Sequence, residues 1–196
     1  MTHNAHIIVQ PASYVEKLPV RDLFATDQPL EVELGAGDGS FLVAWAAQNR
    51  ARNFLAVERL LGRLRKAERK ARRAGLTNVR LLRIEAGYFL EYLLPAGSVA
   101  AIHVYFPDPW PKRKHWRHRL IDDHFTTVAA TALQPGGVIY LRTDDGAYFR
   151  QMTDVFARNK AFTPVPTPPD LKVVLTDFER GFQARGVSTC RAAYRT

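Results

Sequence analysis

The sequence has little cysteine, since Cys190 is the only one among its 196 residues. No disulfide can therefore form within the chain, and no cysteine-based metal site is expected. Long apolar runs are also missing, because none approaches the roughly 20 residues that a membrane-spanning helix needs. The first residues lack a basic segment followed by an apolar stretch, so we expect no signal peptide. These absences favour a cytoplasmic protein without a membrane partner and without a metal.

Acidic residues are outnumbered in this chain. There are 19 Asp and Glu against 28 Lys and Arg, which gives a net charge of +9. A surplus of this size favours an anionic partner, nucleic acid before membrane. The length fits one domain with a substantial core, and the ordinary composition excludes disordered and fibrous classes. We expect a monomer, because one domain of this size leaves no obvious apolar helix face unused.

Short apolar runs alternate with longer helical patterns, which predicts an α/β fold with a parallel sheet covered by helices. The expected strands are 30–34, 54–57, 79–84, 99–106, 138–141 and 187–194, and the expected helices are 40–50, 60–74, 122–133, 147–159 and 176–184. Residues 163–169 are expected to form a proline-rich connector. Residues 1–20 are expected to be an irregular N-terminal arm, and residues 21–196 the domain itself.

A carboxylate stands at or near the end of each of the first five expected strands. These residues are Glu33, Glu58, Glu85, Asp108 and Asp144. The carboxyl ends of the strands are where an open α/β sheet binds its ligands. One such acid is easily explained as a helix N-cap, but five at one edge are hard to assign to capping alone. The pattern predicts a ligand site at this edge.

The loop after the first strand reads Gly35-Ala36-Gly37-Asp38-Gly39. A dinucleotide fingerprint is G-x-G-x-x-G and holds a pyrophosphate at a helix N-terminus. Here the third glycine is out of place, and Glu33 just before the loop would repel pyrophosphate but suits a cationic amino group. S-adenosylmethionine, with an ammonium, a sulfonium and no phosphate, fits better than a nicotinamide cofactor. A plain strand-to-helix turn is the alternative for this loop.

Two further acids complete the predicted methyl-donor pocket. Glu58 lies 19 residues after Gly39, a position from which an acid can accept hydrogen bonds from ribose hydroxyls. The alternative is a surface acid that pairs with Arg59 or Arg63. Glu85 would face the adenine edge, although an exposed strand end also tolerates a glutamate.

Residues 106–111, Phe-Pro-Asp-Pro-Trp-Pro, place one carboxylate among three prolines. Each proline locks its own φ and restricts the residue before it, so Asp108 is expected to be held rigidly. Residues 112–119 then supply five Lys or Arg, two His and a Trp, which attract phosphate and can stack on a base. This combination predicts chemistry on a nucleic acid. The alternative is a proline-terminated strand followed by a solvated basic helix.

At these motifs the chain resembles the bacterial tRNA (guanine-N7-)-methyltransferases of the TrmB type. The resemblance rests on residues 32–39, on residues 106–110 with Lys112, on Arg142-Thr143-Asp144, and on Thr176-Asp177-Phe178-Glu179 followed by Gly186. It implies a Rossmann-like class I methyltransferase fold, with a mostly parallel seven-stranded sheet and helices on both faces. It also implies S-adenosyl-L-methionine as methyl donor, S-adenosyl-L-homocysteine as product, and tRNA as partner, methylated at N7 of a guanosine in the variable-loop region.

The resemblance also implies roles for single residues. Those matching cofactor-binding positions are Glu33, Gly35, Gly37, Glu58, Glu85 and Asp108, and those matching tRNA-binding positions are Lys112, Asp144, Thr176, Asp177, Phe178 and Glu179. Asp108 also matches the active-site acid. The family often has Asp in place of Glu85, and the N-terminal arm here is short. Thr176 and Glu179 have the spacing of a capping box, so a helix cap is the alternative for them.

Guanine N7 carries a lone pair and no proton, so it can attack a sulfonium methyl in line. No metal, covalent intermediate or general base is required, and positioning can supply about 7–11 kcal/mol. Positive charge moves onto the purine during transfer. We therefore expect Asp108 to orient and stabilise the guanine rather than to act as a base.

Basic and aromatic side chains are expected to bind the tRNA. Those expected to hold phosphates are Lys112, Arg113, Lys114, Arg117 and Arg119, and those expected to stack on bases are Trp110, His115 and Trp116. Core packing is the alternative for Trp110. Residues 59–73 contain eight basic residues and one acid, and either extend this surface or form an ordinary solvated face.

Three other functions compete with a tRNA methyltransferase. A nicotinamide-dependent dehydrogenase is disfavoured by the missing third glycine of the fingerprint and by Glu33. An amine methyltransferase acting on DNA would want D-P-P followed by an aromatic residue, which residues 108–110 match only in part. A tRNA-binding module without activity would explain the charge but not five acids at one sheet edge.

Overall fold

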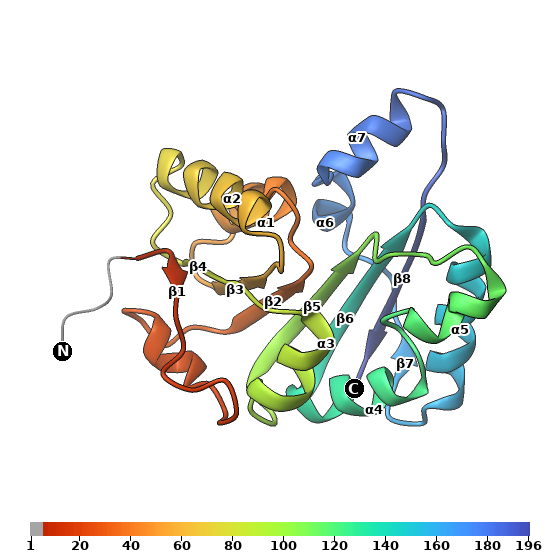
Figure 1. Ribbon diagram of the computed structural model, residues 1–196, viewed down its shortest axis with the longest axis horizontal. Coiled ribbons are helices and arrows are strands. Elements are labelled where there is room, and N and C mark those ends of the chain that lie inside the picture. The colour runs from red at the N-terminus through yellow and green to blue at the C-terminus, as the bar shows by residue number, and fades with distance from the viewer. Residues whose placement is uncertain (1–5) are drawn as a thin grey trace.

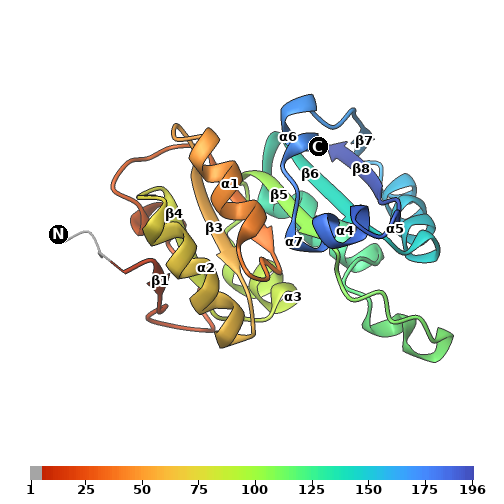
Figure 2. The ribbon, with the colours of Figure 1, turned by 90° about the horizontal axis from the view of Figure 1, so that it is seen from above.

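Eight strands form one twisted sheet in the computed structural model, which describes residues 6–196 (Figures 1 and 2). Their order across the sheet is β1-β4-β3-β2-β5-β6-β8-β7. The strands are β1 (Ile8–Val9), β2 (Leu30–Leu34), β3 (Asn53–Val57), β4 (Val79–Leu82), β5 (Val99–Tyr105), β6 (Leu133–Thr143), β7 (Thr163–Pro164) and β8 (Cys190–Arg195). All pairs from β1 to β6 are parallel, whereas β8 runs antiparallel to both β6 and β7.

Helices cover both faces of the sheet. The α-helices are α1 (Ser40–Gln48), α2 (Leu61–Arg73), α3 (Ala86–Tyr88), α4 (Asp123–Ala132), α5 (Gly146–Arg158), α6 (Pro169–Val173) and α7 (Asp177–Gln183). Three other helical turns are η1 (Val20–Leu23), η2 (Phe89–Leu93) and η3 (Arg113–His118). One core cluster joins α1, α2 and α6 to the sheet, and another joins η2, α4 and α5 to the opposite face. Strands β2 and β3 are buried along their whole length because both of their faces are covered.

The strand order reverses between β2 and β5. From β2 the chain builds outward through β3 and β4, and it then returns to add β5 and β6 on the other side of β2. Leu34 pairs with Val104 in the register of β2 and β5, so the residues that follow these strands leave the sheet side by side. A crevice at such a switch point is where doubly wound α/β sheets bind ligands.

The structure corrects two expectations. Within residues 6–196 the sheet has eight strands rather than seven, because two short edge strands, β1 next to β4 and β7 next to β8, join the six strands expected from the sequence pattern. Strand β1 lies inside the expected irregular arm, where Val9 and Leu18 are buried in the core. Burial of these apolar side chains gives the segment a defined path against the sheet. Residues 1–5 of the expected arm lie outside the described residues.

The other expected strands and helices are present, with ends that differ by a few residues. The largest difference is β6, which begins at Leu133 rather than at Val138. Apart from β1, six short elements of residues 6–196 were not expected: the turns η1, η2 and η3, helix α3, strand β7 in the proline-rich connector, and helix α6, which begins at the last residue of that connector. Pro169 opens α6, where the missing amide hydrogen costs nothing and the proline φ already suits a helix.

Candidate active site

Glu33 lies near the carboxyl end of β2 and is only 4% exposed. Its Oε2 atom is buried and has no hydrogen-bond partner among the described residues. Burial raises the pKa of this carboxyl to about 8, although the positive charge of Arg142 opposes the shift. A buried acid without a partner is costly, and a cationic ligand group would satisfy it. The observation fits the ammonium of S-adenosylmethionine.

Glu58, at the end of β3, holds the glycine loop. Its Oε2 accepts a hydrogen bond from the Gly37 amide at 3.0 Å, and its Oε1 accepts one from the Leu60 amide at 2.8 Å. The alternative of a surface ion pair with Arg59 or Arg63 is not what the structure shows, because Glu58 is buried. The carboxylate therefore fixes the loop at the same sheet edge as Glu33.

Gly39 allows α1 and α2 to approach each other closely. Its φ is +75°, and a Cβ built on it would lie 2.5 Å from the Cβ of Ala67 in α2. Gly35 and Gly37 also have positive φ, but a Cβ on either would meet no atom within 4 Å. The loop thus combines left-handed turns, which glycine adopts readily, with open space beside the first two glycines. This geometry leaves room for a ligand along the loop.

Glu85 serves as the N-cap of α3. Its Oε1 accepts from the Gly87 amide at 2.9 Å and its Oε2 from the Tyr88 amide at 2.7 Å. The side chain is exposed at the end of the segment that follows β4. Capping therefore accounts for its presence here, and its contact with adenine stays a prediction.

The loop after β5 is strained at two bulky residues. Phe106 has a φ of +53° and Trp110 a φ of +44°, a left-handed region that residues of this size rarely adopt. Such conformations cost roughly 1–3 kcal/mol each and cluster at functional sites. The Phe106 amide donates to the Arg142 carbonyl at 2.8 Å, and the Pro109 carbonyl accepts from Arg119 Nε at 2.7 Å. These bonds brace the loop on either side of Asp108, whose side chain is exposed.

The prediction that Arg119 holds a tRNA phosphate is wrong. Its side chain is buried, and Nη1 donates to Gln151 at 2.6 Å in addition to the bond with Pro109. The guanidinium also lies over the rings of Trp116 and Tyr148, at 4.5 and 4.6 Å from their centroids. A guanidinium satisfied in this way supports the loop and does not face solvent.

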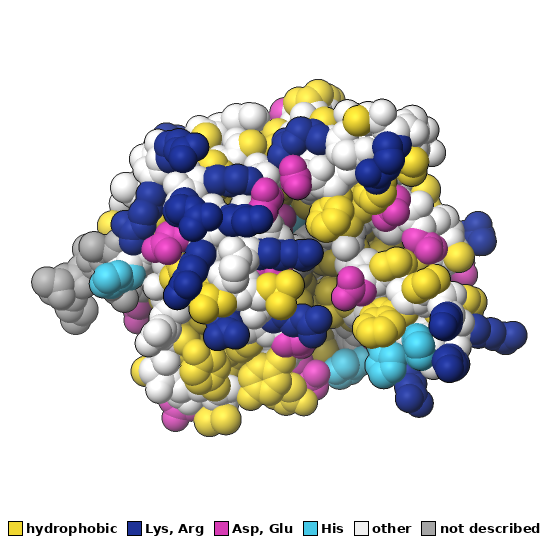
Figure 3. All heavy atoms as spheres, turned by 45° about the horizontal axis from the view of Figure 1, so that its top comes forward, with side chains coloured by type: hydrophobic (Ala, Val, Ile, Leu, Met, Phe, Trp, Pro, Cys, Tyr) yellow, Lys and Arg dark blue, Asp and Glu magenta, His cyan; other side chains and the backbone are white. Residues whose placement is uncertain are grey.

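The other basic residues of this segment are exposed, as expected. They are Lys112, Arg113, Lys114 and Arg117, all on or next to η3. Trp110 is 37% exposed and stands beside His115 and His118, so it is not a core residue. In Figure 3 this group of Lys, Arg and His lies on one side of the face, and a larger group of Lys and Arg lies on the opposite side.

The four residues of the segment 176–179 lie in two different environments, two of them buried and two exposed. Thr176 and Glu179 form a capping box, and Glu179 is fully buried. The structure therefore supports the helix-cap alternative for these two, and neither side chain is left open to a ligand. Asp177 and Phe178 are exposed instead, and the Phe178 ring lies 6.1 Å from that of Phe106. Asp144 is exposed at the end of β6.

Two buried groups beneath the site were missed by sequence reasoning. Arg142 donates to the carbonyls of Leu171 and Val174 at 2.6 and 2.7 Å, and its guanidinium lies 4.3 Å from the Tyr105 ring centroid. Arg142 belongs to the motif Arg142-Thr143-Asp144 that supports the family resemblance, but its position at the end of an apolar run, the signal for a buried arginine, was not interpreted.

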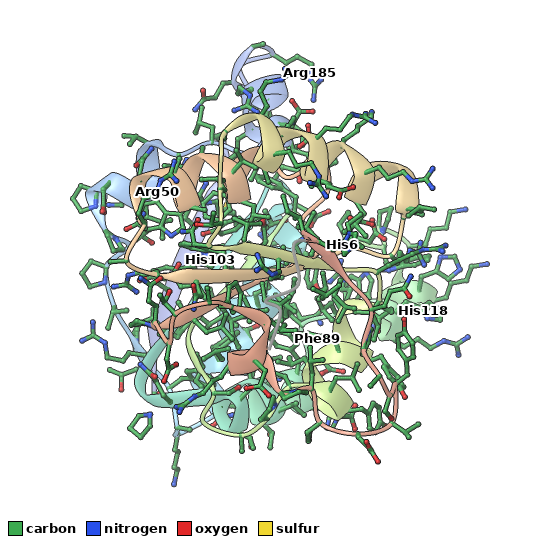
Figure 4. All side chains as sticks on the ribbon, turned by 90° about the vertical axis from the view of Figure 1, so that its left-hand side faces the viewer. His6, Arg50, Phe89, His103, His118 and Arg185 are labelled. Carbon is green, nitrogen blue, oxygen red and sulfur yellow. The ribbon has the colours of Figure 1, made fainter. Side chains whose placement is uncertain are left out.

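The second group centres on Glu31, whose Oε2 accepts from Trp45 at 2.8 Å and lies 2.8 Å from His103 Nε2. Burial raises the pKa of Glu31, but the hydrogen bonds from His103 and Trp45 outweigh it and the net shift is downward. Figure 4 shows His103 within the sheet, below the helices. Alternation along β2 was the signal, since Glu31 and Glu33 share one face of the strand.

The site as a whole lies at one edge of the sheet. Glu33, Glu58 and the glycine loop stand at the ends of β2 and β3, and Asp108 and Asp144 follow the adjacent strands β5 and β6. Across residues 6–196, no three His, Cys, Asp or Glu residues are grouped so that they could hold a metal ion. In the same part of the chain, no helix is both long and apolar enough to cross a bilayer.

Comparisons with known proteins agree with this geometry. A family model described as "Putative methyltransferase" matches residues 27–192. A tRNA (guanine-N(7)-)-methyltransferase from Syntrophotalea carbinolica is 35% identical over 85% of this chain and 73% of that protein. One from Paenarthrobacter aurescens is 41% identical over 71% of this chain, which spans only 46% of that protein. The crystal structure of the 16S rRNA methyltransferase KamB has a TM-score of 0.63 at 16% identity, covering 90% of both chains.

The sheet, its switch point and the glycine loop define a class I S-adenosylmethionine-dependent methyltransferase fold. The relatives place the chain more narrowly. It belongs to the tRNA (guanine-N(7)-)-methyltransferase family.

Proposed function

We propose that this protein transfers a methyl group from S-adenosylmethionine to N7 of a guanosine in tRNA, in the variable-loop region. The observation that carries the proposal is Glu33, a buried carboxylate with an unpartnered oxygen at the sheet's switch point. It stands one strand away from the strained loop that presents Asp108. The relatives' names supply the substrate and the product, and the net charge of +9 supports a nucleic-acid partner.

The cofactor would lie along the ends of β2 and β3. Glu33 would pair with the ammonium, and the open backbone at Gly35 and Gly37 would lie beside the amino-acid portion. Glu58 would accept hydrogen bonds from the ribose hydroxyls through lone pairs that Gly37 and Leu60 leave unused. S-adenosylmethionine supplies the methyl group from its sulfonium when bound.

The guanine would be held from the β5 side. The Asp108 carboxylate accepts hydrogen bonds from the N1 and N2 protons of the base, which leaves N7 free to face the methyl group. The same negative charge stabilises the positive charge that develops on the purine. Because N7 carries no proton, Asp108 needs only to orient the base and not to deprotonate it.

The tRNA would contact the exposed residues around this edge. They are Lys112 with its basic neighbours on η3, Asp144, Asp177 and Phe178. Glu85 would reach the adenine only through carboxylate lone pairs that its capping bonds do not use. We further propose that the protein acts in the cytoplasm, as a monomer, without a metal.

Methyl transfer with labelled cofactor tests the proposal. Purified protein, tRNA transcript and tritiated S-adenosylmethionine should give label retained in the tRNA, and mass spectrometry of the digested tRNA should identify N7-methylguanosine. Binding of tRNA without incorporated label would instead indicate a binding module without activity. Label on another atom would refute the assignment of N7.

A further inference from the structure

A hollow of about 410 Å³ lies between α1, α2 and α7, outside the cofactor edge. It is lined by Ser40, Val43, Ala44, Lys70, Arg73, Ala74 and Arg180. Three of these residues are cationic, and they come from α2 and from α7, which are far apart in the sequence. Figure 4 shows α7, with Arg185 near its end, standing above α1 and α2.

The three cations differ in how many hydrogen bonds and ion pairs they form with other residues. Lys70 is bound to Asp38 and to the Ser40 hydroxyl, so its charge is already partly neutralised. Arg180 donates to the Leu175 carbonyl at 3.2 Å and lies 3.7 Å from Asp177, an exposed pair that is worth little. Arg73 has no hydrogen bond or ion pair through its guanidinium among the described residues. Two exposed guanidinium groups are therefore available at the hollow.

The floor of the hollow admits a small group. Ala44 and Ala74 are small, and Val43 adds an apolar wall, so a tetrahedral anion could approach the helices between the two arginines. Guanidinium groups suit such an anion because their N–H donors match phosphate oxygens in pairs. Of the acids near the hollow, Asp38 is paired with Lys70, whereas Asp177 lies 3.7 Å from Arg180 in the weak exposed pair described above. The charge and the hydrogen-bond donors of the hollow therefore suit a phosphate group as its ligand.

The basic residues of α2 continue this surface toward the cofactor edge. Arg63, in the first turn of α2, lies with its guanidinium carbon 6.0 Å from the centroid of the Phe178 ring in α7. In Figure 3 the Lys and Arg side chains gather over this part of the face. A nucleic-acid backbone that crosses α7 could thus contact both the hollow and the site.

We propose that the hollow between α1, α2 and α7 binds a phosphate of the tRNA backbone through Arg73 and Arg180. This inference rests on the proposed function and deepens it, since it gives the tRNA a second contact outside the cofactor edge. It also places that contact beside Lys70, which holds Asp38 and Ser40 at the end of the glycine loop. The proposed phosphate site on the tRNA-binding surface therefore lies next to the glycine loop that would bind the cofactor.

The test compares two double variants that remove the same charge. Arg73→Gln/Arg180→Gln removes the proposed ligands, and Lys160→Gln/Arg195→Gln removes two exposed cations near the opposite edge of the sheet. Binding of a tRNA transcript is measured at several KCl concentrations. The plot of log K against log salt has a negative slope, and each lost phosphate contact should make it less steep by about 0.7–0.9. Near 0.1 M salt this change weakens binding roughly fivefold to eightfold.

The proposal is supported if the Arg73/Arg180 variant loses slope and affinity in this range while the control pair stays close to the wild type. Equal slopes for the two double variants would overturn it. Arg73→Gln alone, which disturbs no hydrogen bond, provides the same comparison if the double variant does not fold. A wild-type protein that binds tRNA but does not methylate it would refute the proposed function and leave this comparison valid. Failure of the wild type to bind tRNA would refute both.

Discussion

Arg142 and Glu179 form a buried ion pair of 2.7 Å between β6 and α7. Both side chains are almost completely buried, and Glu179 also accepts from Arg191 at 2.9 Å and from the Thr176 amide at 3.0 Å. The Arg142 carbonyl meanwhile accepts from the Phe106 amide. One arginine therefore links α7 to the strained loop that carries Asp108.

Replacing Glu179 with Gln should destabilise the protein strongly. The substitution leaves the buried charge of Arg142 without its partner, and removing one member of such a pair typically costs about 3–5 kcal/mol. Urea unfolding measures the change in the free energy of unfolding. Asp123→Asn is the control, because it weakens the exposed pair with Arg158 and should cost less than about 1 kcal/mol. Similar losses for both variants would contradict the structural role of Glu179.

Binding of S-adenosylmethionine should strengthen as the pH rises toward 8. Burial raises the pKa of Glu33 to about 8, so below that pH the carboxyl is protonated in the free protein. Pairing with an ammonium favours the charged form, so binding must release this proton, and the affinity should fall up to about tenfold for each pH unit below 8. Isothermal titration calorimetry in buffers of different ionisation enthalpy measures both the affinity and the proton release.

The variant Glu33→Gln is the control for this pH dependence. It cannot ionise, so its affinity should be lower at pH 8 and should not vary with pH through this group. A wild-type affinity that stays constant from pH 6 to 8 would show that Glu33 does not bind the ammonium as a carboxylate.

Gly39→Ala should be destabilising, whereas Gly62→Ala should not. At Gly39 the added methyl would lie 2.5 Å from Ala67 Cβ, at a φ of +75°, so α1 and α2 would have to separate. Overpacking of this kind typically costs about 1–3 kcal/mol. Gly62 lies inside α2, where a Cβ meets no atom within 4 Å, and alanine there should add roughly 0.4–1 kcal/mol of stability. Thermal unfolding measures the two changes: the melting temperature should fall for Gly39→Ala and rise for Gly62→Ala.

Much of the sheet and of its ligand edge could be predicted from the sequence, because both depend on local patterns. Continuous apolar runs between helical segments predicted β2 to β6, and acids after these runs predicted the edge where Glu33 and Glu58 stand. The strand β1 was missed because two residues carry no periodicity. Helix α3 was missed because it is a single turn that depends on the Glu85 cap.

The wrong predictions at the site concern residues whose burial depends on contacts with distant parts of the chain. Arg119 looks like its exposed neighbours in a basic run, and only the positions of Pro109 and Gln151 reveal that it is buried. Glu179 finds its partner in Arg142, which lies 37 residues earlier in the chain. Composition cannot distinguish such buried charges from solvated ones, because burial is decided by the packing of α7 and the loop after β5.

Asp108→Asn should lower turnover sharply while S-adenosylmethionine still binds. The substitution keeps the size of the side chain and its proline-braced position, but it removes the charge that accepts hydrogen bonds from the base and stabilises the methylated purine. Losing one preorganised electrostatic contact of this kind typically costs about a hundredfold to a thousandfold in rate. Single-turnover methyl transfer measures the chemical step, and calorimetry measures cofactor binding. Asp154→Asn, an exposed acid on α5, is the matched control and should leave both unchanged. Wild-type turnover in the Asp108 variant would show that other residues orient the guanine. A loss of cofactor affinity as large as the loss of turnover would show that Asp108 contacts the cofactor rather than the base.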